Sequence, residues 1–373
     1  MTGSDESQLT YSDSGVDYGG VDPAKVSAQD IAKTTASELE KFNMKEISLS
    51  RGESAYVWEE KDSYRALVIE GLGTKNLVAD AMRATTGKTH YDQIAQDAIA
   101  MIVNDLIVVG ALPNVVNAYF AIGDADWMRD QERTNDLLRG WANACKLSGA
   151  TWGGGETPPL KGIVDPATID IAGSAVGIIA NKSNLVLGDK LEAGDRIILV
   201  ESSGIHSNGL TMTRKIAEGL PNGFATKMPN GQMFGEALLT PTHIYVDLVR
   251  ALQEAKVELH YMVNVTGHGW RKLMRANRDD LAYIIEQVPE YHAEFDFIKA
   301  QANASVEEMY GNFNMGVGFA IYVPEKYAEQ VVEIASSVNL KAWDAGHVVS
   351  DDKAVRIKPL DIEFKSDSLG VRG

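Results

Sequence analysis

The sequence predicts an α+β fold of two domains in which strands and helices are mixed. Its 373 residues fit about two domains of ~100–200 residues each. Apolar strand patterns and amphipathic helical patterns alternate along the chain, but without the regular spacing of a βαβ series. A polar stretch with Gly and Asp turn residues at 181–194 predicts the domain boundary. We therefore expect an arm at 1–20 and domains at 21–183 and 184–373.

Each element follows from a local pattern. Asp22 and Pro23 predict the start of a helix that runs to about Phe42, because Pro is favoured at the first helical position. The other elements expected in the first domain are a strand at 66–70, a helix from about Asn76, a helix at 92–110, a strand at 115–122, a helix at 126–147 and a strand at 168–179. Those expected in the second domain are strands at 196–201, 257–263, 281–286, 315–323 and 341–347, and helices at 210–218, 241–254 and 325–337.

Composition excludes several classes of protein. Asp and Glu number 52 against 35 Lys and Arg, a net charge of −17 that repels nucleic acid. The single cysteine, Cys145, rules out an internal disulfide and fits a reducing compartment. The N-terminus has no signal-peptide pattern, and the most apolar stretch, 98–112, is shorter than the ~20 residues that span a bilayer. We therefore expect a cytoplasmic protein with no membrane partner.

A glycine-containing turn, Glu70-Gly71-Leu72-Gly73-Thr74-Lys75, follows the expected strand at 66–70. Glycines let the backbone approach a phosphate, a helix start supplies N–H donors, and Lys75 supplies positive charge. The turn does not match the Walker pattern G-x-x-x-x-G-K-[ST]. Taken alone, it describes either a phosphate-binding loop or a plain strand-to-helix turn.

Acidic residues interrupt the apolar helix expected at 92–110. At 100° per residue, Asn104 lies about 20° from Asp97 around the helix, and Asp105 lies about 80° from Asp97. A carboxylate is costly to bury among apolar residues unless it is paired or binds a metal, and oxygen ligands favour Mg²⁺. The alternative is a helix cap or a surface turn.

Two further loops concentrate residues suited to ligand binding. Three glycines at 153–155 precede Glu156, which permits close backbone approach beside a carboxylate, although a flexible turn has the same pattern. The loop at 202–209, Ser-Ser-Gly-Ile-His-Ser-Asn-Gly, lies between a strand and a helix and contains His206. Such a loop either binds phosphate, with His206 as proton donor or anion ligand, or caps a helix beside a surface histidine.

Taken in order, these motifs resemble those of aminoimidazole ribonucleotide synthetase, also called phosphoribosylformylglycinamidine cyclo-ligase. The segment 11–17 is similar to that family's Y-x-D-x-G-V-D, 70–75 to its D-G-V-G-T-K, and 103–113 to its V-N-D-L-x-x-x-G-A-x-P. The matches continue in register with 154–157, 202–209 followed by Arg214-Lys215, Thr266-Gly267 and the segment 313–318, Phe-Asn-Met-Gly-Val-Gly. The resemblance spans about residues 10–350, and the order of seven motifs makes it specific.

The resemblance implies ATP-dependent closure of an imidazole ring in purine biosynthesis. ATP would phosphorylate the amide oxygen of formylglycinamidine ribonucleotide, an amine nitrogen would attack the activated carbon, and phosphate would leave. It also implies a homodimer whose N-terminal sheets join into one barrel, with ATP in a groove along it.

By the same resemblance, residues at matching positions receive roles. The implied catalytic residues are Asp105, Glu156 and His206. The implied ATP-binding residues are Glu70, Gly71, Gly73, Thr74, Lys75, Asp97 and Asn104, of which Glu70, Asp97 and Asp105 would hold Mg²⁺. The implied binding residues for the ribonucleotide substrate are Ser203, Ser207, Asn208, Thr266 and Asn314.

Four positions depart from the family's pattern. Glu70 replaces an Asp, a G-G-F-G segment before it is absent, and 158–160 read Pro-Pro-Leu instead of Ala-Glu-Met. Leu273 stands where T-G-G-G-F is followed by an Asn. These departures leave open another ATP-using member of the superfamily, or a nucleotide-binding protein without turnover. Selenophosphate synthetase and the hydrogenase-maturation member need a terminal reactive Cys, whereas the only cysteine here is Cys145.

Overall fold

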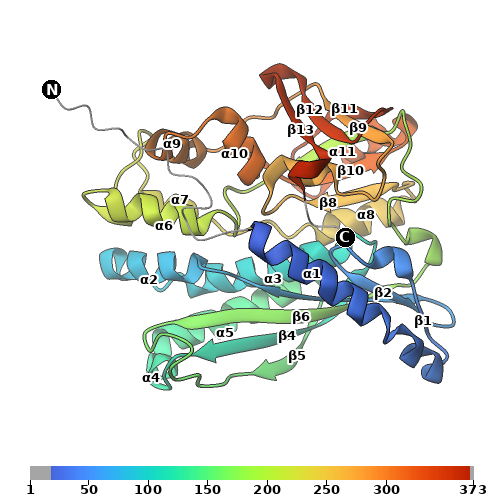
Figure 1. The fold of residues 1–373 in the computed structure, drawn as a ribbon. Helices are drawn as coiled ribbons and strands as arrows, with labels where there is room; N and C mark the ends of the chain where they lie inside the picture. Colours follow the sequence, from blue (N-terminus) through green and yellow to red (C-terminus); the bar gives the residue numbers. More distant parts are fainter. Residues whose placement is uncertain (1–17, 370–373) are drawn as a thin grey trace.

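The computed structural model describes residues 18–369 and contains two β-sheets with helices packed between them (Figure 1). The first sheet has the strand order β1-β2-β3-β6-β4-β5, and all neighbours are antiparallel except β4 and β5. Its strands are β1 (Lys45–Glu46), β2 (Tyr56–Glu59), β3 (Tyr64–Gly71), β4 (Leu112–Ile122), β5 (Thr151–Glu156) and β6 (Ile169–Ile179).

The second sheet has the order β13-β12-β9-β11-β7-β10-β8, with β12 and β9 parallel and the other neighbours antiparallel. Its strands are β7 (Arg196–Glu201), β8 (Tyr261–Asn264), β9 (Leu281–Ile285), β10 (Val317–Val323), β11 (Ala342–Ser350), β12 (Ala354–Ile357) and β13 (Ile362–Lys365). The mixture of sheets and helices confirms the predicted α+β class.

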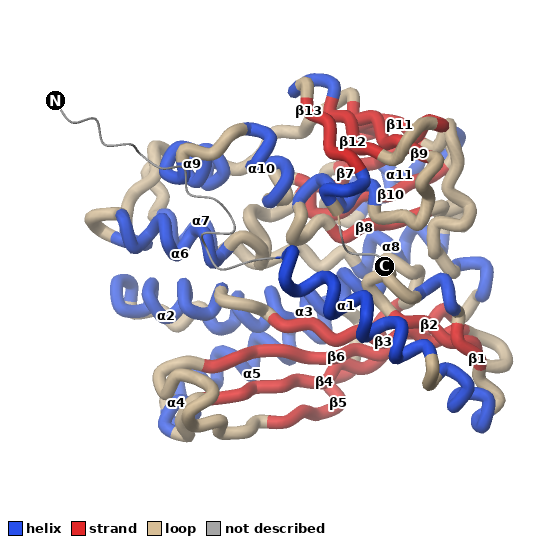
Figure 2. The backbone as a smooth tube through the Cα atoms, viewed as in Figure 1, coloured by secondary structure: helices blue, strands red, loops and turns tan. Residues whose placement is uncertain are grey.

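Figure 2 shows that helices cover only one face of the first sheet, the face toward the second domain. The helices of the first domain are α1 (Tyr18–Lys33), α2 (Lys75–Thr86), α3 (Tyr91–Ile107), α4 (Asp126–Arg129) and α5 (Gln131–Leu147). Those of the second are α6 (Leu210–Gly219), α7 (Phe234–Leu238), α8 (Val246–Glu254), α9 (Ala293–Ala302), α10 (Val306–Asn312) and α11 (Ala328–Ser337). Among the described residues, no helix is long and apolar enough to cross a membrane.

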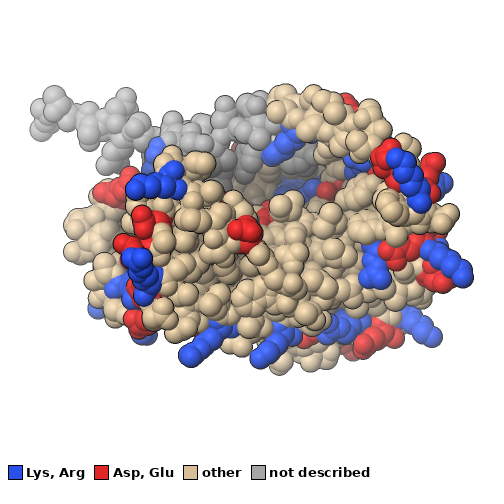
Figure 3. Space-filling view, turned by 90° about the horizontal axis from the view of Figure 1, so that it is seen from below, with Lys and Arg blue, Asp and Glu red and all other residues tan. Residues whose placement is uncertain are grey.

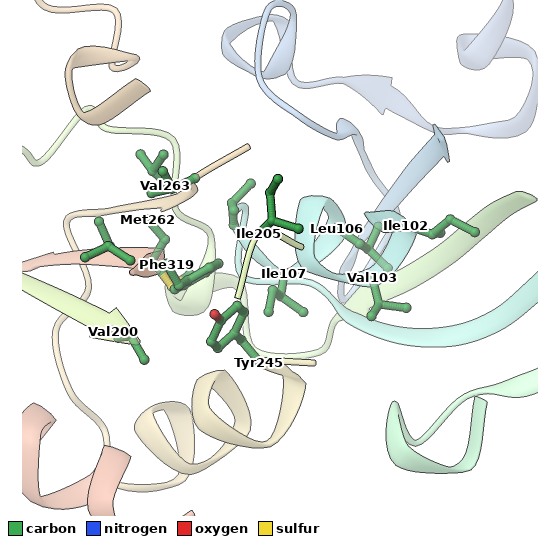
Figure 4. Packing of buried hydrophobic residues seen from close by; sticks show 14 of the residues in the cluster. Ile102, Val103, Leu106, Ile107, Val200, Ile205, Tyr245, Met262, Val263 and Phe319 are labelled. Atoms are coloured by element: carbon green, nitrogen blue, oxygen red, sulfur yellow. The ribbon is translucent and has the colours of Figure 1, made fainter. Parts of the chain in front are cut away.

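Helix α3 lies at the centre of the molecule. Thirteen of its side chains are buried, because apolar residues surround its axis on more than one face. Figure 4 shows Leu106 and Ile107 of α3 beside Ile205 and Tyr245 of the second domain. The buried apolar side chains of both domains therefore form one continuous core.

Several predicted boundaries are wrong. The helix expected at 22–42 begins at Tyr18, ends at Lys33 and is followed by a separate 3₁₀ helix at Ala36–Phe42. The helix expected at 126–147 breaks at Asp130, whose side chain accepts a hydrogen bond from the backbone N–H of Arg133 and so caps α5. The helix expected at 241–254 begins only at Val246. The segment 11–17 and most of the expected arm lie outside the described residues.

The strands β1, β2, β5, β12 and β13 were not predicted. β5 was missed because its three glycines carry no apolar alternation, and Gly155 instead meets the backbone of Ala118 so closely that a Cβ would lie 2.2 Å from the Ala118 carbonyl oxygen.

The second face of the first sheet has no helix over it. Ile69 is 75% exposed, and Leu67 and Val115 are 42% and 39% exposed. Figure 3 views the molecule from below Figure 1 and shows few charged side chains over the middle of this surface, with charges at its margins. A shallow groove of about 330 Å³ runs over it beside Ile69 and Tyr119. We call this surface of β3, β6 and β4 the open face.

Gly173 of β6 marks the closest approach of α3 to the sheet. A Cβ at Gly173 would lie 2.7 Å from Cδ1 of Ile102 and 2.5 Å from the carbonyl oxygen of Asn117. Overpacking of this kind costs about 1–3 kcal/mol. We therefore expect Gly173→Ala to lower the free energy of unfolding by that amount, measured by urea denaturation followed by tryptophan fluorescence.

The matched control is Gly219→Ala at the end of α6, where no heavy atom lies within 4 Å of the added Cβ. This variant should unfold at the urea concentration of the parent or slightly higher. Equal losses in both variants would contradict the close packing of α3 on β6.

Candidate functional site

Two carboxylates meet where β3 ends against α3. Glu70 is the second-last residue of β3, and Asp105 lies in the last turns of α3. Their carboxyl groups lie close to each other, and Asp105 Oδ1 accepts from Nδ2 of Asn264, 2.7 Å away in the second domain. Burial, and then the charge of Asp105, raise the pKa of Glu70 well above its usual range. Two acids held this close together favour either a shared proton or a bound cation.

A lysine completes this group of side chains. Lys272 lies in the 3₁₀ helix Gly269–Met274, is 7% exposed, and donates from Nζ to Oγ1 of Thr266. Burial lowers the pKa of Lys272 to about 8, although the nearby Asp105 opposes that shift. We call Glu70, Asp105, Asn264, Thr266 and Lys272 the carboxylate cluster.

Sequence reasoning did not single out Lys272. Lys272 follows Arg271 shortly after Thr266-Gly267, and such a basic pair is typical of a solvent-exposed helix. Only the fold shows that Lys272 is buried. The oxygen donors of Glu70 and Asp105 fit Mg²⁺, which binds through one or two carboxylates together with nucleotide phosphates.

Lys75 and Asp97 form a separate ion pair inside the molecule. Nζ of Lys75 lies 2.8 Å from Oδ2 of Asp97, and both side chains are completely buried. Nζ also donates to the carbonyl oxygens of His206 and Thr240, at 2.9 and 3.0 Å. Asp97 Oδ1 accepts from the backbone N–H and hydroxyl of Thr242. This pair joins the two domains.

Asp97 is thus not brought to the carboxylate cluster. It precedes Asp105 by eight residues on α3, a separation of about 12 Å along the axis at 1.5 Å per residue. Its carboxylate charge is balanced by Lys75 instead.

Asn104 lies on the face of α3 that carries Asp97, as the helical angle predicted. Its Nδ2 donates to the carbonyl oxygen of His243 at 2.8 Å, and its Oδ1 accepts from the N–H of Tyr245 at 3.0 Å. Both amide atoms therefore hold the chain at 243–245 against α3.

The glycine turn between β3 and α2 presents its backbone to the outside. Gly71 and Gly73 are exposed, and no heavy atom lies within 4 Å of a Cβ placed at either position. Gly73 has φ +75°, which favours glycine. Thr74 precedes α2 and makes no capping bond with its side chain. The peptide groups of this turn are accessible to a ligand.

The loop at 202–209 turns its histidine inward. His206 is 1% exposed, with φ 59°, and its Nε2 accepts from the N–H of Ser203 at 3.2 Å. Burial, followed by the nearby His243, Lys75 and His292, lowers the pKa of His206 well below its usual range. The imidazole is therefore neutral and holds its own loop.

Other predicted site residues also make internal bonds. The Ser203 hydroxyl donates to the carbonyl oxygen of Pro241 at 2.6 Å, and Ser207 lies 3.5 Å from the Thr242 hydroxyl. Asn314 Nδ2 donates to the carbonyl oxygen of Gly204 at 2.8 Å.

Asn208 differs from these residues. Its Oδ1 accepts from the N–H of Gly267 at 3.0 Å, which joins the loop 202–209 to the segment that holds Thr266. Its Nδ2 is buried and finds no hydrogen-bond partner within residues 18–369. Asn208 therefore offers a free donor.

Glu156 stands apart from the carboxylate cluster within one chain. It is exposed at the end of β5, the edge strand of the first sheet. In the strand register, Glu70 is paired with Gly173 of β6, which is paired with Ala118 of β4, which is paired with Gly155 of β5. Three strand spacings, about 14 Å, therefore separate Glu70 from this edge of the sheet.

The buried ion pair generates a prediction on stability. Lys75→Met leaves the Asp97 carboxylate without its counter-ion, and breaking a buried pair typically costs about 3–5 kcal/mol. Adding Asp97→Asn removes the uncompensated charge, so the double variant should recover most of the loss. Urea denaturation of both variants measures this difference. A single variant as stable as the parent would contradict the pairing.

The chain is similar to known proteins over most of its length. Residues 52–179 match the family model for the N-terminal domain of AIR synthase related proteins, and residues 192–358 match the model for the C-terminal domain. A protein of Carboxydothermus hydrogenoformans named phosphoribosylformylglycinamidine cyclo-ligase is 36% identical over 361 residues, which cover 94% of this chain and 99% of that protein.

Solved structures share the fold at low identity. The HypE–HypF complex contains a chain with a TM-score of 0.59 and 18% identity, covering 84% of this chain and 93% of that chain. The hydrogenase maturation protein HypE in complex with ATP gives a TM-score of 0.55 at 18% identity, covering 73% of this chain and 78% of that chain. The resemblance predicted from the ordered motifs is confirmed over almost the whole length, and the chain belongs to the phosphoribosylformylglycinamidine cyclo-ligase family.

Proposed function

We propose that this protein closes the imidazole ring of formylglycinamidine ribonucleotide, using ATP, to give aminoimidazole ribonucleotide in purine biosynthesis. The observation that carries the proposal is the carboxylate cluster, in which Glu70 and Asp105 lie together in the first domain and Asp105 accepts a hydrogen bond from Asn264 of the second. The named relative at 36% identity supports the same reaction. A phosphorylated substrate does not diffuse freely across membranes, which favours a cytoplasmic location.

The chemistry must activate an amide, because its oxygen is a poor leaving group. The amide oxygen attacks the γ-phosphorus of ATP and ADP leaves. The amine nitrogen then attacks the activated carbon and forms the C–N bond of the ring. Inorganic phosphate leaves with the former amide oxygen, and the nitrogen loses a proton. Holding amine and carbon together makes the attack intramolecular, so positioning supplies much of the rate.

We assign ATP to the first domain, at residues 21–183. The exposed backbone of Gly71 and Gly73, with Thr74 at the start of α2, would receive the phosphates. Glu70 and Asp105 would hold Mg²⁺, which neutralises phosphate charge when it is bound. Lys75, Asp97 and Asn104 would support this region from the interior, through the bonds that join α2 and α3 to the second domain.

We assign the ribonucleotide to the second domain, at residues 184–373. Asn208 and Thr266 would contact it, because the free Nδ2 donor of Asn208 needs an acceptor and the N–H of Gly267 links the two segments. Ser203, Ser207, His206 and Asn314 would act by fixing the shape of this loop.

We infer that the open face is covered by a second copy of this chain. A surface of exposed Leu67, Ile69 and Val115 with few charges is unfavourable in water, and the edge strand β5 beside it is also exposed. Joining two open faces would close two half-barrels into one barrel. It would also bring a second copy to the edge where Glu156 lies, which accounts for a site residue placed away from Asp105.

The function is tested by turnover with the ribonucleotide. Purified protein with Mg²⁺, ATP and formylglycinamidine ribonucleotide should release ADP only when the ribonucleotide is present and should form aminoimidazole ribonucleotide. Asp105→Asn keeps the side-chain shape but removes a carboxylate charge, so Mg²⁺–ATP binding by calorimetry should weaken at least about tenfold, or about 1.4 kcal/mol.

Asp92→Asn is the matched control, since Asp92 lies exposed in the first turn of the same helix and should not alter binding. ATP binding without ribonucleotide-dependent turnover would instead favour a nucleotide-binding protein. Unchanged affinity in Asp105→Asn would remove Asp105 from the metal site.

The assembly is tested by light scattering. The parent should have twice the 40.5 kDa chain mass at micromolar concentration. Ile69→Glu places a charge in the centre of the open face and should give the monomer mass. Leu147→Glu, at a 56% exposed residue on α5, should leave the mass unchanged. A monomeric parent would contradict the shared barrel.

A further inference from the structure

Asn264 joins the second domain to the Asp105 carboxylate. It is the last residue of β8, is 4% exposed, and donates from Nδ2 to Oδ1 of Asp105 at 2.7 Å. Asp105 is itself buried, so water contributes little to the solvation of its carboxylate. A buried carboxylate depends on hydrogen-bond donors from the protein, and this donor crosses the interface between the two domains.

The backbone on either side of Asn264 holds its amide in place. In the strand register, Asn264 is paired with Phe319 of β10. Three residues further along the chain, the N–H of Gly267 donates to Oδ1 of Asn208 at 3.0 Å. The segment 264–267 is thus fixed at both ends, and the Nδ2 donor of Asn264 has little freedom to move.

The side chain of Asp105 needs such a fixed partner. The torsion that turns an aspartate carboxylate has no sharply preferred value, so the backbone of α3 alone does not determine where the two oxygens point. The hydrogen bond from Asn264 determines it by fixing Oδ1. A carboxylate has about four acceptor positions, and because this bond uses one of them, capacity remains for a cation.

We propose that Asn264 is a positioning residue, which holds the Asp105 carboxylate in the orientation that receives Mg²⁺. This inference rests on the proposed function, in which Asp105 belongs to the metal site. Asn264 acts through Asp105 rather than by contact with the nucleotide. Removing a partner of this kind typically changes metal affinity about 10–100-fold. The metal site of the first domain is therefore complete only when the second domain packs against α3.

The test measures binding of Mn²⁺, the probe in place of Mg²⁺, in the presence of a non-hydrolysable ATP analogue, with electron paramagnetic resonance to count the free ion. Asn264→Leu has a side chain of similar size without a hydrogen-bond donor. This variant should bind Mn²⁺ about tenfold more weakly than the parent, because Asp105 is then free to turn. If Asn264→Leu does not fold, Asn264→Ala, which adds no atoms to the core, gives the same measurement.

A second background shows whether the effect passes through Asp105. In Asp105→Asn the carboxylate is already absent, so adding Asn264→Leu should cause no further loss of Mn²⁺ affinity. A general loosening of the site would instead lower the affinity by the same factor in both backgrounds.

Ser50→Ala is the matched control for lost stability. The buried Ser50 hydroxyl donates to the carbonyl oxygen of Ile47 at 2.7 Å and accepts from the N–H of Val57 at 2.9 Å. Its removal, like Asn264→Leu, leaves a buried partner unsatisfied, so both variants should unfold at lower urea concentrations than the parent. Ser50→Ala should nevertheless bind Mn²⁺ like the parent.

The possible results separate the role of Asn264 from the metal site itself. Parent-like Mn²⁺ affinity in Asn264→Leu, or an equal loss in both backgrounds, would overturn the role of Asn264 while leaving the metal site intact. A parent that binds no Mn²⁺ even with the analogue would overturn the metal site of the proposed function and the role of Asn264 together.

Discussion

Helix α3 is buried on nearly every side, and the rest of the structure depends on satisfying the polar groups that it carries inside. One side of this helix packs on the first sheet, with Ile102 beside Gly173, and another meets the apolar side chains of the second domain. Asp97, Asn104 and Asp105 are therefore placed where water cannot solvate them. Each finds its partner in the second domain, at Thr242, His243, Tyr245 and Asn264. The polar residues of one helix thus fix how the two domains fit together.

The same helix carries buried charge of two kinds. Near its middle, the charge of Asp97 is balanced by Lys75. Backbone groups supply the other hydrogen bonds of both side chains. Near its end, Asp105 lies beside a second carboxylate, Glu70, and accepts a hydrogen bond from Asn264. A matched pair has little to gain from a ligand, whereas two neighbouring acids gain from an added cation. Both parts of α3 carry an aspartate, but of the two only Asp97 forms an ion pair within residues 18–369. We therefore assign Asp105 to the reaction and Asp97 to the stability of the fold.

The sequence predicted most central elements because their patterns are local. The apolar runs of β3, β4, β6 and β7 and the helical periodicity of α3 were sufficient to place them. The angle between Asp97 and Asn104 correctly predicted a shared face, since both contact the segment 242–245. Burial of Lys75 could not be predicted, because the carbonyl oxygens that it contacts belong to the other domain. Burial of His206 depends on residues distant in sequence, His243 and Tyr245, and could not be predicted either. Strand β5 could not be predicted either, because its glycines carry no apolar alternation and Gly155 packs directly against the backbone of Ala118. The order of the motifs along the chain identified the family. The motifs did not distinguish the residues that face a ligand from those that fix the shape of the loops.

The segment at 241–245, which precedes α8, has a consequence for motion. Besides the bonds to Asp97 and Asn104, Gln96 Nε2 of the first domain donates to the carbonyl oxygen of Thr242 at 3.0 Å. A hinge rotation of one domain against the other would break all of these bonds together inside the core, where no water could replace them. A local rearrangement of surface turns such as Gly71–Thr74 breaks none of these bonds, so opening the site there costs less than a rotation of one domain against the other.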